Sequence, residues 1–144
     1  KRVRAINATL SVKMKKLCSC ENIVIEFAND IGFQSARKCS CDYCSRKNAE
    51  YVSNPKEPIS FEVIDKAKRK IITHGYRSAE FHECVNCGLV LVTSTIEGAT
   101  YCVLNAKVLG IKGYTLDQEA RDFSAESIDA RQARRKSNWS PVQD

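Results

Sequence analysis

The spacing of the cysteines constrains this chain more than any other feature of its sequence. Seven of the eight cysteines in the 144 residues fall into three tight clusters, at 18–20, 39–44 and 84–87. Cysteines separated by one residue cannot all pair as disulfides without strain, because a disulfide requires a specific separation of the two Cα atoms. Thiolate ligands of a metal ion are commonly spaced this closely. The clusters therefore predict metal binding and a reducing, cytoplasmic setting.

The two outer clusters together offer four sulfur ligands, which are Cys18, Cys20, Cys84 and Cys87. Four thiolates complete the tetrahedral coordination of Zn²⁺, and closed sites of this kind are structural. They contribute free energy of folding directly, which suits a small domain with a modest core. The sequence predicts a structural zinc held by these four residues. The alternative is that one or both pairs are buried thiols that bind nothing.

The middle cluster offers three ligands, Cys39, Cys41 and Cys44, within six residues. Three protein ligands leave the fourth tetrahedral position to water or substrate, which is the arrangement of a catalytic zinc. We therefore expect a second, catalytic Zn²⁺ and two zinc ions per chain. The alternative is that a fourth protein ligand closes this site, and the candidates for it are His74, His82 and Cys102.

Charged and polar residues near the middle cluster are the candidates for handling a substrate. The cations that flank the cluster, and that would attract an anionic substrate, are Arg37, Lys38, Arg46 and Lys47. The candidates for the general acid or base are Asp42, Tyr43 and His82. We expect Tyr43, Tyr51 and Phe61 to serve core packing rather than a pocket.

The remaining pattern predicts a mainly β fold of short antiparallel strands with a C-terminal helix. Alternating or β-branched runs predict strands at 23–27, 59–63, 89–93 and 101–104. Residues 124–136 lack Gly and Pro and carry acidic residues early and basic residues late, which favours a helix. We expect Ile128 and Trp139 to anchor that helix to the sheet. The organisation is an N-terminal extension at 1–14 and one zinc-binding domain at 15–140.

The formal charge of +6 gives only weak support for a nucleic-acid partner. Seven zinc-bound thiolates remove seven charges and two Zn²⁺ ions return four, so the metal-bound protein is only mildly basic. No apolar run approaches the length of about 20 residues that spans a bilayer, so no membrane association is expected. The arginine-rich stretch at 131–136 is interpreted as the solvated end of a helix.

The order of the cysteine clusters resembles the CENP-V/GFA family, which includes the glutathione-dependent formaldehyde-activating enzymes. The resemblance covers about residues 15–140. The motifs that carry it are Leu17-Cys18-Ser19-Cys20, Cys39-Ser40-Cys41-Asp42-Tyr43-Cys44-Ser45-Arg46, Cys84-Val85-Asn86-Cys87-Gly88 and Arg134-Arg135-Lys136-Ser137-Asn138-Trp139. Family members commonly carry Gly after the first pair and again beyond the triplet, where this chain has Glu21 and the stretch 47–49.

The resemblance implies a small zinc-bound β-tent and a carbon–sulfur lyase. The outer pairs would hold the structural zinc, and the triplet would hold the catalytic one. The implied reaction is that of S-(hydroxymethyl)glutathione synthase, with a small thiol such as glutathione as substrate. Two alternatives from other classes remain. One is a non-enzymatic module in which both zinc ions are structural and a surface recognises a macromolecule, and the other is a redox-sensing thiol switch at the middle cluster.

Overall fold

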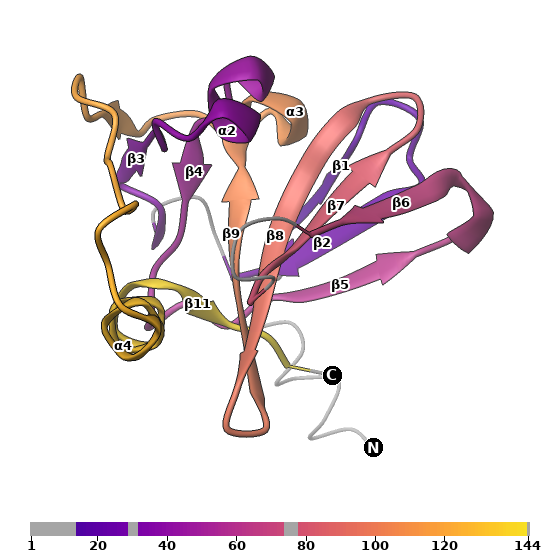
Figure 1. Ribbon diagram of the computed structural model, residues 1–144. Coiled ribbons are helices and arrows are strands. Elements are labelled where there is room, and N and C mark those ends of the chain that lie inside the picture. Colours follow the sequence, from indigo (N-terminus) through magenta and orange to yellow (C-terminus); the bar gives the residue numbers. More distant parts are fainter. Residues whose placement is uncertain (1–13, 29–31, 74–77, 144) are drawn as a thin grey trace.

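The computed structural model describes residues 14–28, 32–73 and 78–143 and consists of two β-sheets with short helices and one longer helix (Figure 1). The elements in chain order are β1 (Met14–Leu17), β2 (Ile23–Phe27), β3 (Ser35–Arg37), α2 (Asp42–Lys47), β4 (Tyr51–Val52), β5 (Ser60–Val63), η2 (Lys66–Lys68), β6 (Arg69–Ile72), β7 (Glu80–Cys84), β8 (Gly88–Ile96), β9 (Ala99–Asn105), α3 (Ala106–Leu109), β10 (Thr115–Leu116), α4 (Ile128–Asn138) and β11 (Ser140–Pro141). The mainly β fold with a C-terminal helix is confirmed. No helix in these described segments is long and apolar enough to cross a membrane.

The smaller sheet has the order β1-β2-β5, and all its pairings are antiparallel. Its central strand β2 alternates as the sequence predicts, so that Ile23, Ile25 and Phe27 are buried on one face. The predicted strand at 59–63 forms as β5, in which Ile25 pairs with Phe61. Residue Ile59 lies just outside it and makes an isolated parallel bridge to Val142.

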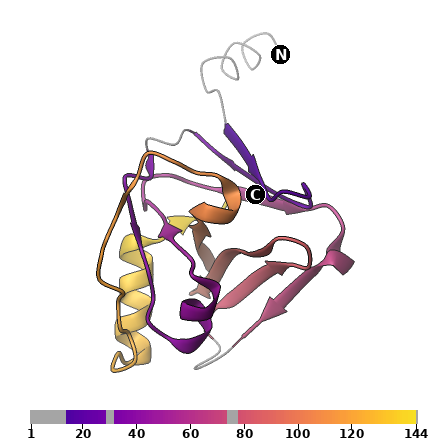
Figure 2. The same ribbon diagram turned by 90° about the horizontal axis from the view of Figure 1, so that it is seen from above.

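The larger sheet has the order β10-β3-β4-β9-β8-β7-β6, with β11 paired to β9. Its longest strands, β8 and β9, contain the predicted runs 89–93 and 101–104 and extend beyond them. Seen from above, the three-stranded sheet lies across from β6, β7 and β8 (Figure 2). Only the pairing of β10 with β3 is parallel among the strand pairs of the described residues.

Two apolar clusters occupy opposite faces of the larger sheet. Along β9, Cys102 and Leu104 belong to the cluster that also contains the β2 side chains, whereas Val103 belongs to the other cluster. This division follows from the alternation of side chains along a strand. The second cluster contains Trp139 and Cys44, so it lies where the middle cysteine cluster meets the end of α4.

The C-terminal helix begins later and ends later than the predicted range of 124–136. Its N-cap is Ser127, whose hydroxyl accepts a hydrogen bond from the amide of Ala130 at 3.1 Å. The backbone amide of Ser124 donates instead to the carboxylate of Asp122 at 2.9 Å, in a turn before the helix. Trp139 is 6 % exposed and anchors the end of the helix, but the expectation for Ile128 is wrong because that side chain is 49 % exposed.

Candidate metal centres

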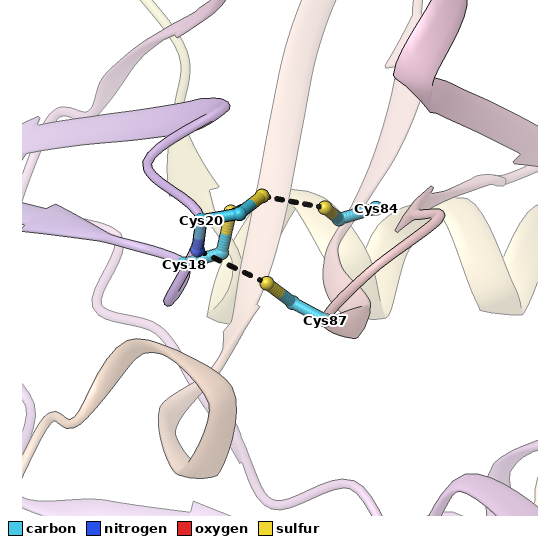
Figure 3. Close-up of side chains that lie close together, drawn as sticks. All are labelled: Cys18, Cys20, Cys84 and Cys87. Atoms are coloured by element: carbon cyan, nitrogen blue, oxygen red, sulfur yellow. Dashed lines mark hydrogen bonds between the residues drawn. The ribbon is translucent and has the colours of Figure 1, made fainter.

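The outer cysteine pairs converge on one point, which we call the first cysteine group (Cys18, Cys20, Cys84 and Cys87). Their four sulfur atoms all lie within 4.8 Å of one another. The Sγ atom of Cys20 lies 3.7 Å from that of Cys18 and 3.3 Å from that of Cys84 (Figure 3). Four sulfurs at these distances can surround a single metal ion, so the sequence prediction that these residues act together agrees with their placement.

Two tight turns position these four side chains. Cys18 and Cys20 lie in the turn between β1 and β2, which is closed by a hydrogen bond from the amide of Glu21 to the carbonyl of Cys18 at 2.7 Å. Glu21 adopts a left-handed conformation there, with φ of 66°. The other pair lies in the turn between β7 and β8, where Gly88 has φ of 93°. This positive φ is readily available to glycine.

The charges of the first cysteine group also fit a cation. A hydrogen bond from Cys84 lowers the pKa of Cys20 to about 6, while burial raises the pKa values of Cys84 and Cys87. Clustered thiols therefore resist ionising together, because each additional thiolate repels the others in a partly buried site. A divalent ion at the centre compensates that repulsion. A set of four cysteine sulfurs is the donor chemistry of a structural zinc.

The middle cysteines form the second cysteine group (Cys39, Cys41 and Cys44), whose sulfur atoms also lie within 4.8 Å of one another. Cys41 is the N-cap of α2, and its sulfur accepts a hydrogen bond from the amide of Cys44 at 3.4 Å. This capping turn brings two of the sulfurs together. Cys39 is held by a parallel bridge to Arg121, in the segment that passes from α3 to α4.

The environment of the second cysteine group differs from residue to residue. A hydrogen bond from Cys44 lowers the pKa of Cys39, and the same contact, with burial, raises the pKa of Cys44. The sulfur of Cys44 also lies 3.1 Å from the hydroxyl of Tyr51 on β4. Tyr51 was expected to serve core packing rather than a pocket. It packs in the second apolar cluster, but the second half of the expectation is wrong, because Tyr51 contacts Cys44 and also lines a cavity.

No fourth His, Cys, Asp or Glu of the described residues joins the second cysteine group. His82 uses its ring nitrogens elsewhere, with Nδ1 3.0 Å from Arg69 and Nε2 2.9 Å from Thr93. Cys102 is fully buried in the apolar cluster on the opposite face of the sheet. The third candidate, His74, lies outside the described residues.

A cavity of about 640 Å³ opens beside the second cysteine group, and all three of its cysteines line it. We call this space the cavity. Part of its wall is apolar and consists of Ala79, Phe81, Val92, Val103, Phe123 and Trp139. Tyr51 also lines it. Cavities of about 300–1,000 Å³ are typical of small-molecule sites.

Five cationic side chains line the cavity, namely Arg37, Lys38, Arg131, Arg134 and Arg135. The first two were expected from the sequence. Arg46 and Lys47 are not among the lining residues, and Lys47 instead forms an ion pair with Glu83 at 3.1 Å. The three α4 arginines were interpreted as a solvated helix end, which is wrong for Arg135 because it is only 6 % exposed. Their i, i+3, i+4 spacing shows that the three lie on one helix face, but it does not show that this face is covered.

The predicted acid–base candidates do not line the cavity. Asp42 is exposed in the first turn of α2. The hydroxyl of Tyr43 donates to the carboxylate of Glu83, and burial raises the pKa of Tyr43 well above its usual range. His82 is buried, which lowers its pKa to about 4. The lining carboxylate is that of Asp122, whose pKa is lowered by the backbone amide of Ser124.

Comparison with known proteins gives a fold relationship only. No family model matches the chain, and no curated protein matches it significantly. Among solved structures, a crystal structure of a Rhodobacter sphaeroides protein from a structural genomics programme aligns with a TM-score of 0.54 and 23% sequence identity. The alignment covers 72% of this chain and 98% of that one. At this identity the two proteins share a fold, and nothing follows about activity.

Proposed function

We propose that the protein is a zinc-dependent carbon–sulfur lyase that resembles S-(hydroxymethyl)glutathione synthase and belongs with the CENP-V/GFA family. In this proposal the first cysteine group holds a structural zinc and the second holds a catalytic one, in a reducing compartment such as the cytoplasm. One observation carries the proposal: three cysteine sulfurs converge at the wall of a large cavity, and no fourth ligand from the described residues joins them. That arrangement leaves room for a substrate sulfur.

The proposed reaction joins a small thiol, such as glutathione, to an aldehyde. A carbon–sulfur bond forms between the thiol sulfur and the carbonyl carbon, and the π electrons of the carbonyl move to its oxygen. The oxygen gains a proton as the thiol loses one, so the sum is one S-hydroxyalkyl adduct, and the reverse reaction splits it. Zinc, when bound, supplies the Lewis acidity that keeps a thiol ionised near neutral pH.

The residues of the chain have separate parts in this proposal. Cys39, Cys41 and Cys44 would hold the ion. The α2 cap at Cys41 and the bridge between Cys39 and Arg121 fix the backbone that carries these side chains. The cations of the cavity attract an anionic thiol. The apolar wall reduces the access of water to the adduct, which strengthens electrostatic interactions within the cavity. The residues that line the cavity restrict the orientations in which the thiol and the aldehyde can approach each other.

A non-enzymatic module that recognises a macromolecule would need the basic residues of α4 to face that partner. Three of these residues line the cavity instead, which favours a small anionic ligand over a macromolecule. Salt-dependent binding of DNA or RNA in a mobility-shift assay would support the alternative.

The test is the Cys41→Ser variant, with Cys102→Ser as the matched control. The rate of exchange between glutathione, formaldehyde and their adduct is measured by NMR magnetisation exchange, and zinc is counted by mass spectrometry. We expect Cys41→Ser to lose catalysis and to keep one zinc per chain, because the first cysteine group is intact. Cys102→Ser should keep both zinc ions and full activity. Full activity in Cys41→Ser would refute the proposed mechanism.

A further inference from the structure

The α4 arginines form a row along one side of the cavity, which we call the arginine row (Arg131, Arg134 and Arg135). Arg134 makes two hydrogen bonds to the carboxylate of Glu126, at 2.8 and 3.0 Å. Its guanidinium also lies 3.6 Å from the centre of the Phe123 ring. Arg131 shares the same carboxylate, at 3.5 Å. One acidic side chain therefore serves two arginines of the row.

Arg135 is a buried cation that forms no ion pair with a carboxylate of the described residues. The charge of Glu126 acts on it, but that carboxylate already pairs with Arg131 and Arg134. The Nη1 atom of Arg135 donates to the carbonyl and hydroxyl of Ser78, at 3.2 and 3.0 Å, and to the hydroxyl of Ser94 at 3.1 Å. Its Nε atom is buried and has no hydrogen-bond partner in the described part of the chain. A buried charge that is not fully compensated is costly. The burial of Arg135 therefore indicates that an anion can bind beside it in the cavity.

Arg37, the last residue of β3, is a second arginine that lines the cavity. Its Nη2 atom donates to the hydroxyl of Ser53 at 2.8 Å, and no described carboxylate forms an ion pair with it. Burial, together with the positive charges of Arg134 and Arg121, lowers the pKa of Arg37 to about 10. Two independent elements, β3 and α4, thus each bring to the same cavity a guanidinium that forms no ion pair with a described carboxylate.

The rest of the cavity selects for an apolar body. Phe81, Val92, Val103 and Trp139 lie in its wall, and each of them is 8 % exposed or less. A polar chain laid against this wall would lose hydrogen bonds to water that the apolar side chains cannot replace. At about 640 Å³, the cavity also exceeds what a one-carbon aldehyde needs.

We propose that the cavity binds an organic carboxylate with an apolar body, in which the carboxylate is held by the guanidiniums of Arg37, which is partly buried, and Arg135, which is buried. The apolar body lies along the wall between them and the second cysteine group. This inference deepens the proposed function, since it narrows the thiol substrate to a mercapto carboxylic acid with an apolar body. The carboxylate site consists of residues of the cavity wall, and binding there does not require lyase activity.

The chain offers a direct probe, because Trp139 is its single tryptophan and lines the cavity. The experiment titrates the zinc-loaded protein with 4-phenylbutyrate, and with the neutral 4-phenylbutyramide, and follows tryptophan fluorescence. Neither compound carries a thiol. We expect the carboxylate to bind at least about tenfold more tightly than the amide, as a hydrogen-bonded charge pair would give. Equal affinities, or no binding of the carboxylate, would overturn the inference.

Variants locate the carboxylate. Arg37→Met should weaken 4-phenylbutyrate binding about tenfold and leave amide binding unchanged. Arg46→Met is the matched control, because Arg46 lies on α2 outside the cavity lining, and it should bind both compounds as the wild type does. An equal loss of acid and amide binding in Arg37→Met would contradict the charge pairing.

The two proposals fail separately in this design. Binding of 4-phenylbutyrate without any lyase activity would leave the carboxylate site standing and refute the proposed function. Lyase activity with glutathione, together with equal binding of 4-phenylbutyrate and 4-phenylbutyramide, would support the proposed function and refute the carboxylate site.

Discussion

Replacing Glu21 with glycine should stabilise the protein, although the change removes a side chain. Glu21 has φ of 66° in the turn between Cys20 and β2, and its side chain is exposed. A left-handed conformation costs a residue with a β-carbon about 1–2 kcal/mol. Glycine avoids that cost but loses about 0.5–1 kcal/mol through its greater freedom in the unfolded chain. Subtracting the two ranges gives about 0–1.5 kcal/mol, so the net gain for Glu21→Gly is centred on about 0.5–1 kcal/mol.

The assay is thermal unfolding of the zinc-loaded protein by circular dichroism or calorimetry. For a chain of this size, 1 kcal/mol raises the midpoint by about 2–4 °C, so Glu21→Gly should gain roughly 1–4 °C. The matched control is Glu21→Ala, which removes the same charge but keeps the β-carbon and the strained φ. We expect the alanine variant to stay close to the wild type.

A glycine variant no more stable than the alanine variant would refute the reasoning, because the two differ chiefly in the freedom of the backbone. Asn48 provides a second comparison, since it has φ of 51° and caps α2. Asparagine tolerates the left-handed region better than glutamate does, and the side chain of Asn48 accepts a hydrogen bond from Lys38 at 2.9 Å. Asn48→Gly should therefore gain less than Glu21→Gly, or nothing.

Three further outcomes follow from packing and from metal binding. Trp139→Ala should lower the free energy of unfolding by about 3–5 kcal/mol, because this side chain is buried. Ile128→Ala should change it by no more than about 0.5 kcal/mol, because Ile128 is exposed, and denaturant unfolding measures both. A strong zinc chelator should lower the thermal midpoint by about 10 °C or more, because structural zinc binding contributes folding energy; an unchanged midpoint would count against the first cysteine group as a structural centre. Cys102→Val should leave the zinc content unchanged, since Cys102 lies apart from both cysteine groups; loss of an ion would show that Cys102 is a ligand after all.

The features that were predictable from the sequence are those set by local spacing. The alternation of Ile23, Ile25 and Phe27 predicts β2 with its observed bounds, because a period of two places these side chains on one buried face. The cysteine clusters predict the two groups, because cysteines this close in sequence lie on one tight turn and bring their sulfur atoms to one place.

The features that were not predictable depend on contacts between distant segments. Two serines, Ser124 and Ser127, precede the helix, and only the tertiary structure shows that the second one caps it. Arg135 was interpreted as solvated because its charge is typical of an exposed helix end. Its burial comes from Ser78 and Ser94, which lie 57 and 41 residues away along the chain. Short-range patterns contain no signal for that contact.

The central claim is that three cysteines hold a metal ion with one position open to a substrate thiol. Native mass spectrometry of the zinc-loaded protein, recorded with and without a small thiol, tests it most directly. We expect two zinc ions per chain and the addition of one thiol, with the addition lost in Cys41→Ser. A chain that holds one zinc ion, or that holds two and never takes up a thiol, would show that the second cysteine group offers no open metal position.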